Sequence, residues 1–174
     1  MFPSYGIKVE PILIKKIINR FGDETIYESE KIRVTTPEQA FLMVDILRTT
    51  VERGTGRRAK VAGIETAGKT GTTNKNIDAW FCGFTPEIEV LVWYGNDNNS
   101  PMQKYETGGR VAGPAFANFV KGYINIYPQT KRKFTPPEGV TMRKIKGKRE
   151  YFTKTSPLPK TNTLEENESG GMLF

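Results

Sequence analysis

The chain of 174 residues contains no histidine and only one cysteine, Cys82. Without histidine, catalytic triads built on imidazole and most zinc sites are excluded, and a single cysteine excludes an internal disulfide and a cysteine-rich metal site. We expect no metal and no cofactor. Cys82 is most simply interpreted as a half-buried residue of a strand.

Long apolar segments are missing as well. The sequence has no run of about 18 apolar residues and does not open on a charged-then-apolar leader, so we expect neither a membrane segment nor a targeting signal in this chain. The apolar content is nevertheless 37%, with ten phenylalanines and two tryptophans. A chain of this length and composition is expected to form one domain with a substantial core.

The net charge of +7 is concentrated near the C-terminus. Residues 128–174 hold ten Lys and Arg against five Asp and Glu, whereas residues 1–127 hold sixteen against fourteen. Because residues 128–174 are also rich in proline, we predict a folded portion over 1–127 and a basic, mostly flexible, disordered extension over 128–174. Its charge runs are interpreted as solvated, with anionic lipid, nucleic acid or cell-wall polymer as alternative contacts; nucleic acid is not among the expected partners.

A hairpin and a helix are predicted in the first third of the chain. The apolar stretches Pro11 to Ile18 and Thr25 to Tyr27 predict a hairpin. A helix is predicted to begin after Thr36, which is a good N-cap followed by a capping-box glutamine, and to end at Gly54 as a left-handed terminator. The inner stripe of that helix is expected to contain Ala40, Val44, Leu47 and Val51.

Three strands and a second helix are predicted in the middle of the chain. The strands cover Ile64 to Thr72, Ile77 to Phe84 and Ile88 to Tyr94, and their short links require antiparallel neighbours. The helix covers Val111 to Ile124. The expected fold class is therefore α+β, an antiparallel sheet with flanking helices. The inner stripe of the second helix is expected to contain Phe116, Phe119, Val120 and Tyr123.

The stretch Ala67 to Thr73 places a lysine and three threonines beside glycines at the end of a predicted strand, which suits the binding of a carboxylate. The same letters from Gly63 to Thr70 also fit the phosphate-binding P-loop pattern. A P-loop needs an apolar strand before it and a helix after it. Here a basic stretch precedes the motif and a turn-like run follows it, so nucleotide binding is a distant alternative.

Several further motifs occur in a fixed order around this stretch, and together they resemble the C-terminal part of the transpeptidase domain of bifunctional, class A penicillin-binding proteins. The resemblance runs from about Phe2 to Val140 and implies a partial penicillin-binding or serine β-lactamase-like transpeptidase fold. The motifs are Val51-Glu52-Arg53-Gly54-Thr55-Gly56, Gly68-Lys69-Thr70-Gly71-Thr72-Thr73, Asp78-Ala79-Trp80-Phe81, Gly83-Phe84-Thr85-Pro86, Val92-Trp93-Tyr94-Gly95-Asn96-Asp97, Thr107-Gly108-Gly109, Ala112-Gly113-Pro114 and Pro136-Pro137-Glu138-Gly139-Val140.

The resemblance implies roles for five residues in binding peptidoglycan stem peptides and β-lactams. Thr70 and Thr72 would hold the terminal carboxylate, Lys69 would add positive potential and assist proton transfer, and the Thr72 amide would share the oxyanion hole. Gly71 would let the substrate approach the backbone, and Thr73 completes the binding strand. Considered without the resemblance, these are ordinary strand residues, and Lys69 could be a solvated edge lysine.

The family's nucleophile, the serine of a Ser-x-x-Lys motif, and its Ser-x-Asn loop are both absent from the sequence. We therefore expect this chain to be a fragment of a longer parent at the periplasmic or extracytoplasmic face of the cytoplasmic membrane. The N-terminal half of the transpeptidase domain, which carries the catalytic serine, would belong to the rest of that parent. The chain alone is predicted to be inactive. A noncatalytic cell-wall or protein-binding module is the alternative. Asp78 is expected to brace the turn after Thr73, and Trp80 to pack under the adjoining helix.

Overall fold

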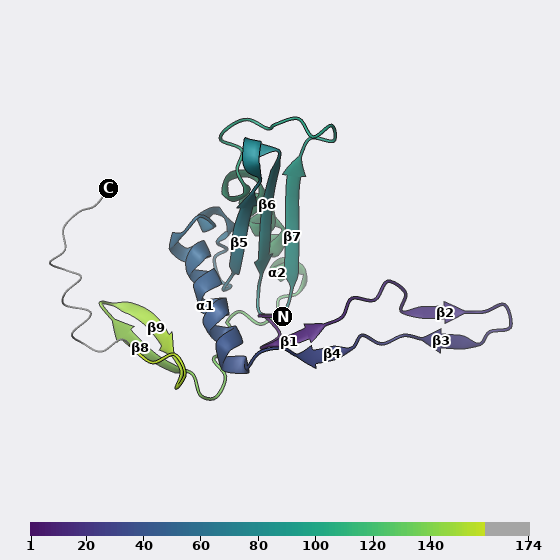
Figure 1. Ribbon diagram of the computed structural model, residues 1–174, viewed down its shortest axis with the longest axis horizontal. Coiled ribbons are helices and arrows are strands. Elements are labelled where there is room, and N and C mark those ends of the chain that lie inside the picture. The colour runs from purple at the N-terminus through teal and green to yellow at the C-terminus, as the bar shows by residue number, and fades with distance from the viewer. Residues whose placement is uncertain (159–174) are drawn as a thin grey trace. The chain divides into compact units, whose positions relative to one another are not determined.

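The computed structural model describes residues 1–158, and it divides the chain into two compact units, Met1–Pro136 and Pro137–Phe174. The first unit contains the sheet and both long helices (Figure 1). The part of the predicted flexible extension that covers residues 159–174 lies outside the described residues.

A three-stranded antiparallel sheet forms the centre of the first unit. Its strands are β5 (Ala67–Thr72), β6 (Asp78–Phe84) and β7 (Glu89–Gly95), in the order β5-β6-β7, as the short links predicted. A short 3-10 turn, η2 (Asn74–Asn76), joins β5 to β6. The sheet thus has β5 at one edge and β7 at the other.

Helix α1 (Pro37–Arg53) begins as the sequence predicted. The Thr36 hydroxyl accepts the backbone N–H of Gln39, and the Gln39 side chain accepts the backbone N–H of Thr36, so the capping box is confirmed. The predicted left-handed terminator is wrong, because Gly54 has a φ of −100°. A glycine is required at this position for a steric reason, because a Cβ there would lie 2.8 Å from the Thr50 carbonyl oxygen.

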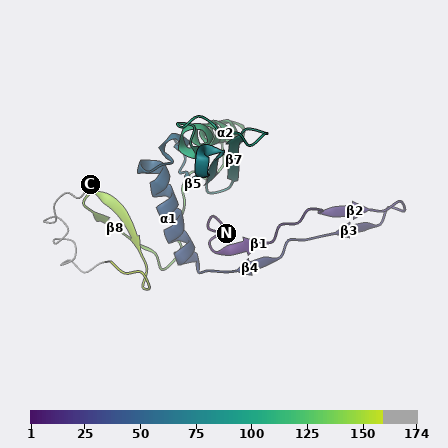
Figure 2. The same ribbon diagram turned by 45° about the horizontal axis from the view of Figure 1, so that its top comes forward.

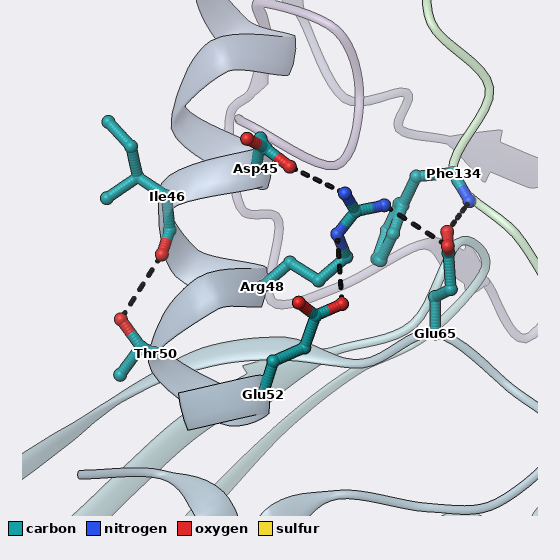
Figure 3. Close-up of polar contacts among 7 residues, drawn as sticks. All are labelled: Asp45, Ile46, Arg48, Thr50, Glu52, Glu65 and Phe134. Atoms are coloured by element: carbon teal, nitrogen blue, oxygen red, sulfur yellow. Dashed lines mark hydrogen bonds and ion pairs between the residues drawn. The ribbon is translucent and has the colours of Figure 1, made fainter. Parts of the chain in front are cut away.

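The buried face of α1 differs from the predicted stripe at one turn. Ala40, Val44 and Val51 are buried, but Leu47 is only partly so and Arg48 is 5% exposed. The Arg48 guanidinium lies among three carboxylates, 2.6 Å from Asp45, 3.1 Å from Glu65 and 3.6 Å from Glu52 (Figure 3). Periodicity could not identify this position, because a buried arginine is tolerated only where carboxylates compensate it.

The second long helix, α2 (Gly113–Ile126), follows a five-residue π-helical turn, η3 (Gly108–Ala112). Phe116 and Val120 are fully buried as predicted, but Phe119 is 54% exposed, so its assignment to the inner stripe is wrong. Ala117 is buried instead, which lets the helix lie close to its neighbours. The core between sheet and helix contains Val51, Ala59, Val61, Ile64, Phe81, Ala112, Phe116, Ala117 and Val120.

The hairpin at the start of the chain consists of two antiparallel pairs that follow one another. Strand β1 (Ile7–Val9) pairs with β4 (Lys31–Arg33), and β2 (Lys16–Ile18) pairs with β3 (Glu24–Ile26), as Figure 2 shows. The predicted hairpin corresponds to β2 and β3; β2 is shorter than the apolar stretch that predicted it, and the pair β1 and β4 was not predicted. Most of their residues are exposed.

The second unit contains a hairpin of β8 (Thr141–Ile145) and β9 (Lys148–Phe152), where the sequence predicted a mostly flexible extension. Lys146 and Gly147 form its turn with φ values of 48° and 78°, and positive φ at both central residues suits the right-handed twist of hairpin strands. Residues 128–136 belong to the first unit, where Phe134 is buried. Over residues 1–158, no helix combines the length and the apolar character that crossing a membrane requires.

Candidate functional site

The free edge of β5 presents the backbone of the lysine-threonine motif. The Thr73 N–H donates to the Asp78 carbonyl on β6 at 3.0 Å, and residues along an antiparallel ladder alternate between hydrogen-bonded and non-hydrogen-bonded pairs. The amides of Thr72 and Thr70 therefore point away from β6. In the described part of the chain no strand other than β6 pairs with β5, so the outward amides of Thr70 and Thr72 have no strand partner.

Lys69 lies at the same edge. It is exposed, and its Nζ donates to the Thr70 carbonyl oxygen at 2.9 Å and lies 3.4 Å from the Thr70 hydroxyl. Side chains of Lys69 and Thr70 start on opposite faces of β5, because successive residues of a strand alternate. The Lys69 side chain nevertheless extends past the edge of β5, so its ammonium group lies beside the Thr70 hydroxyl.

The Thr72 hydroxyl is oriented by the turn that precedes α2. Its Oγ1 accepts the N–H of Gly108, the first residue of η3, at 3.2 Å. Gly108 approaches the strands so closely that a Cβ there would lie 2.6 Å from the Gly71 carbonyl oxygen. Since Gly108 supplies the donor, the Thr72 O–H remains able to donate to a ligand. Gly108 belongs to one of the motifs that carry the family resemblance, but this contact was not predicted from the sequence.

An open pocket of about 400 Å³ lies beside these threonines. The Thr55 and Thr70 hydroxyls are 3.0 Å apart, and both residues line it. Three arginines contribute to the wall, and none of the lining residues is acidic. The arginines were not predicted from the sequence, where their only signal is their place next to the Gly54 to Gly56 and Thr107 to Gly109 motifs. The lining residues are Gly54, Thr55, Arg57, Arg58, Thr70, Thr72, Thr107, Gly109 and Arg110.

Thr73, the fifth predicted binding residue, has a local partner. Its Oγ1 accepts the Asp78 N–H at 2.8 Å and donates to an Asp78 carboxylate oxygen at 3.2 Å. The prediction that Asp78 braces the turn is thus confirmed, and the other carboxylate oxygen accepts the Trp93 indole N–H at 2.9 Å. Neither Thr73 nor Lys69 lines the pocket. The Lys69 ammonium nevertheless lies beside the Thr70 hydroxyl, whereas the Thr73 hydroxyl is directed toward Asp78.

The placement of Trp80 under a helix is wrong. Trp80 is 36% exposed and its ring lies 6.1 Å from that of Trp93, its partner on β7. Because residues alternate along β6, the next residue, Phe81, takes the face covered by α2 and contacts Phe116 with ring centroids 5.0 Å apart. The Trp80 side of the sheet is therefore the uncovered one within the described residues.

The motif from Gly63 to Thr70 does not have P-loop geometry. Lys69 and Thr70 lie inside an antiparallel strand, and the following turn contains Lys75 with a φ of 63° and leads into another strand. A phosphate would thus meet no helix N-terminus after the lysine. Nucleotide binding through this motif is not supported.

The sole cysteine faces the uncovered side of the sheet. Cys82 is partly buried, as predicted, and its thiol lies 3.4 Å from a Glu89 carboxylate oxygen. Burial, followed by the hydrogen bond and the negative charge of Glu89, raises the pKa of the Cys82 thiol above its ordinary value. A raised pKa lowers the fraction of thiolate, which is the nucleophilic form of cysteine. Among the described residues, no three metal-ligating side chains are grouped so as to hold an ion.

Comparison with known proteins agrees with this architecture. Residues 1–121 match the family model of the penicillin-binding protein transpeptidase domain. The chain is 38% identical over 145 residues to a penicillin-binding protein 1A of Aquifex aeolicus, covering 82% of this chain and 20% of that protein. It is 33% identical over 162 residues to a penicillin-binding protein 1A of Clostridium acetobutylicum, covering 90% and 19%.

A solved structure shows the same fold. Penicillin-binding protein 1A from Haemophilus influenzae superposes with a TM-score of 0.76 at 23% identity, over 92% of this chain and 31% of that one. The chain spans about a fifth of the length of the curated relatives described above. Its family match, its relatives and its fold agree, and the chain belongs to the penicillin-binding protein transpeptidase domain family.

Proposed function

We propose that this chain supplies the substrate-binding wall of a D-Ala-D-Ala transpeptidase, the enzyme that cross-links peptidoglycan and is acylated by penicillin. The observation that carries the proposal is the open edge of β5, where the Thr70 and Thr72 amides point outward and the Lys69 ammonium lies 3.4 Å from the Thr70 hydroxyl. A peptide could add to that edge as a further strand. Its terminal carboxylate would meet two hydroxyls and a cation.

The reaction requires a serine from outside this chain, because none of its serines has a lysine three residues later. That serine Oγ would attack the carbonyl carbon between the two D-alanines, forming an ester while the terminal D-alanine leaves with a proton. An amine of a second stem peptide would then attack the ester, forming the cross-link and releasing the serine. The outward amide of Thr72 is suited to stabilise the oxyanion in both steps.

The uncovered face of the sheet supports a partner on that side. Leu91 is 62% exposed, Trp93 44% and Trp80 36%, and all three lie on the face opposite α2. Exposed apolar side chains gathered on one face are typical of a surface that another element covers. We propose that this element is the serine-bearing half of the same transpeptidase domain. Because the proposed substrate is peptidoglycan, we also propose that the parent acts at the extracytoplasmic face of the cytoplasmic membrane.

A chimera tests the proposal. Residues 1–136 of this chain would replace the corresponding segment of the Aquifex aeolicus penicillin-binding protein 1A, and labelling by a fluorescent penicillin would be followed on gels. We expect covalent labelling of the chimera and none of the chain alone. A folded chimera that is not labelled, beside a labelled Aquifex parent, would refute the catalytic role. Peptide binding without labelling would then favour a noncatalytic binding module.

A further inference from the structure

The three arginines of the pocket come from two separate segments with buried anchors. Arg57 and Arg58 lie on a 3-10 turn, η1 (Arg57–Ala59), whose last residue, Ala59, is fully buried in the core. Arg110 lies on η3, where Gly108 is held against the sheet. The backbone that carries these side chains is thus fixed, although the side chains themselves are exposed.

In the part of the chain that the structure describes, no protein group is paired with these three charges. Within residues 1–158, none of the three guanidinium groups has an ion pair or a side-chain hydrogen bond, and no Asp or Glu lines the pocket. Arg48 shows the contrast, because three carboxylates surround it. Like charges that share a concave surface without counter-charge create a positive potential, which favours an anionic ligand.

The number of charges favours a ligand with more than one acidic group. A terminal carboxylate at Thr70 and Thr72 would balance one positive charge, and the Lys69 ammonium is already beside Thr70. Three guanidinium groups would then still lack a counter-ion. The pocket volume of about 400 Å³ lies in the range of small-molecule sites, so it has room for more than a single carboxylate.

We infer that Arg57, Arg58 and Arg110 form a second anion subsite beside the carboxylate-binding threonines. The subsite selects ligands that carry a second carboxylate in addition to the terminal one. Guanidinium groups suit this task, because they bind carboxylates with paired hydrogen bonds and stay charged at all relevant pH values. The inference rests on the proposed function, which identifies the first carboxylate as the terminal carboxylate of a stem peptide. The stem peptide bound here would therefore present a second carboxylate to the three arginines.

The test uses the full chain and two simple probes at constant ionic strength: acetate, with one carboxylate, and glutarate, with two. Backbone amide shifts of Thr70, Thr72 and Gly109 would be followed by NMR. We expect glutarate to bind at least roughly tenfold more tightly than acetate. Arg110→Gln and the double variant Arg57→Gln/Arg58→Gln should each reduce glutarate affinity roughly three- to tenfold, since these exposed contacts are partly screened.

Two controls define the outcome. Arg20→Gln removes the same charge from the first hairpin and should leave both affinities unchanged, and the amide spectrum of each variant reports whether it is folded. Equal binding of acetate and glutarate, or equal losses in the Arg20 and pocket variants, would overturn the subsite. Because no acylation is measured, selective glutarate binding together with an unlabelled chimera would leave the subsite supported and refute only the transpeptidase role.

Discussion

Replacing Thr72 by valine tests the proposed carboxylate site most directly. Valine keeps the backbone amide, the branched shape and the strand preference, and removes only the hydroxyl. In the structure that hydroxyl accepts the Gly108 N–H at 3.2 Å, which leaves its own proton for a ligand oxygen. One hydrogen bond to a charged group contributes about 1.5 to 3 kcal/mol, so acylation efficiency should fall roughly ten- to a hundredfold.

The matched control is Lys75→Met. Lys75 lies in the turn after β5, is exposed and does not line the pocket. Its ammonium can contribute only a screened, long-range potential, so its loss should change acylation by less than roughly a factor of five. Thr72→Ser provides a second control, because serine restores the hydroxyl and should recover most of the lost efficiency.

The assay is the second-order rate constant of acylation by a fluorescent penicillin, measured on the chimera with the Aquifex aeolicus protein. Circular dichroism would show that each variant is folded. Equal losses for Thr72→Val and Lys75→Met, or no recovery with Thr72→Ser, would mean that the carboxylate is held by other residues.

Further predictions concern the chain itself. Arg48→Met should lower the free energy of unfolding by roughly 2 to 4 kcal/mol, because it leaves carboxylates uncompensated beside the helix; urea denaturation measures this, and a loss below about 1 kcal/mol would refute it. Penicillin should form no covalent adduct with the isolated chain, and an intact-mass increase of one penicillin would contradict this. Glu89→Gln should lower the raised pKa of Cys82 and so increase its alkylation rate by iodoacetamide at pH 8, since more thiolate is present; an unchanged rate would count against the Glu89 contribution. The isolated chain should self-associate through the face around Trp93, and a monodisperse monomer in light scattering would argue against an unpartnered face.

The sheet and the start of α1 could be predicted from the sequence because their signals are local. Short links allow only antiparallel strands, and a threonine followed by a proline and a capping-box glutamine specifies where α1 begins. The end of α1 at Gly54 is also confirmed, but the reason for the glycine differs: a Cβ there would lie too close to the Thr50 carbonyl oxygen, whereas its φ is not left-handed.

Positions that depend on tertiary contacts were predicted less well. Arg48 reads as a surface residue, yet it is buried because Glu65, from a different segment, supplies a counter-charge. Trp80 was expected under a helix, but strand alternation gives that face to Phe81. The pocket arginines come from two segments that the fold brings together, so no local pattern could group them.

The turn η3 links both proposed subsites to the packing of α2. Its first residue, Gly108, donates to the Thr72 hydroxyl, its third, Arg110, lines the pocket, and its last, Ala112, is buried in the core. A π-helical turn adds a residue to the helical ladder and is common where function constrains the backbone. The additional residue lets one short segment meet the strand, the pocket and the core at once. The geometry of the carboxylate site and that of the arginine subsite therefore depend on the same five residues of backbone.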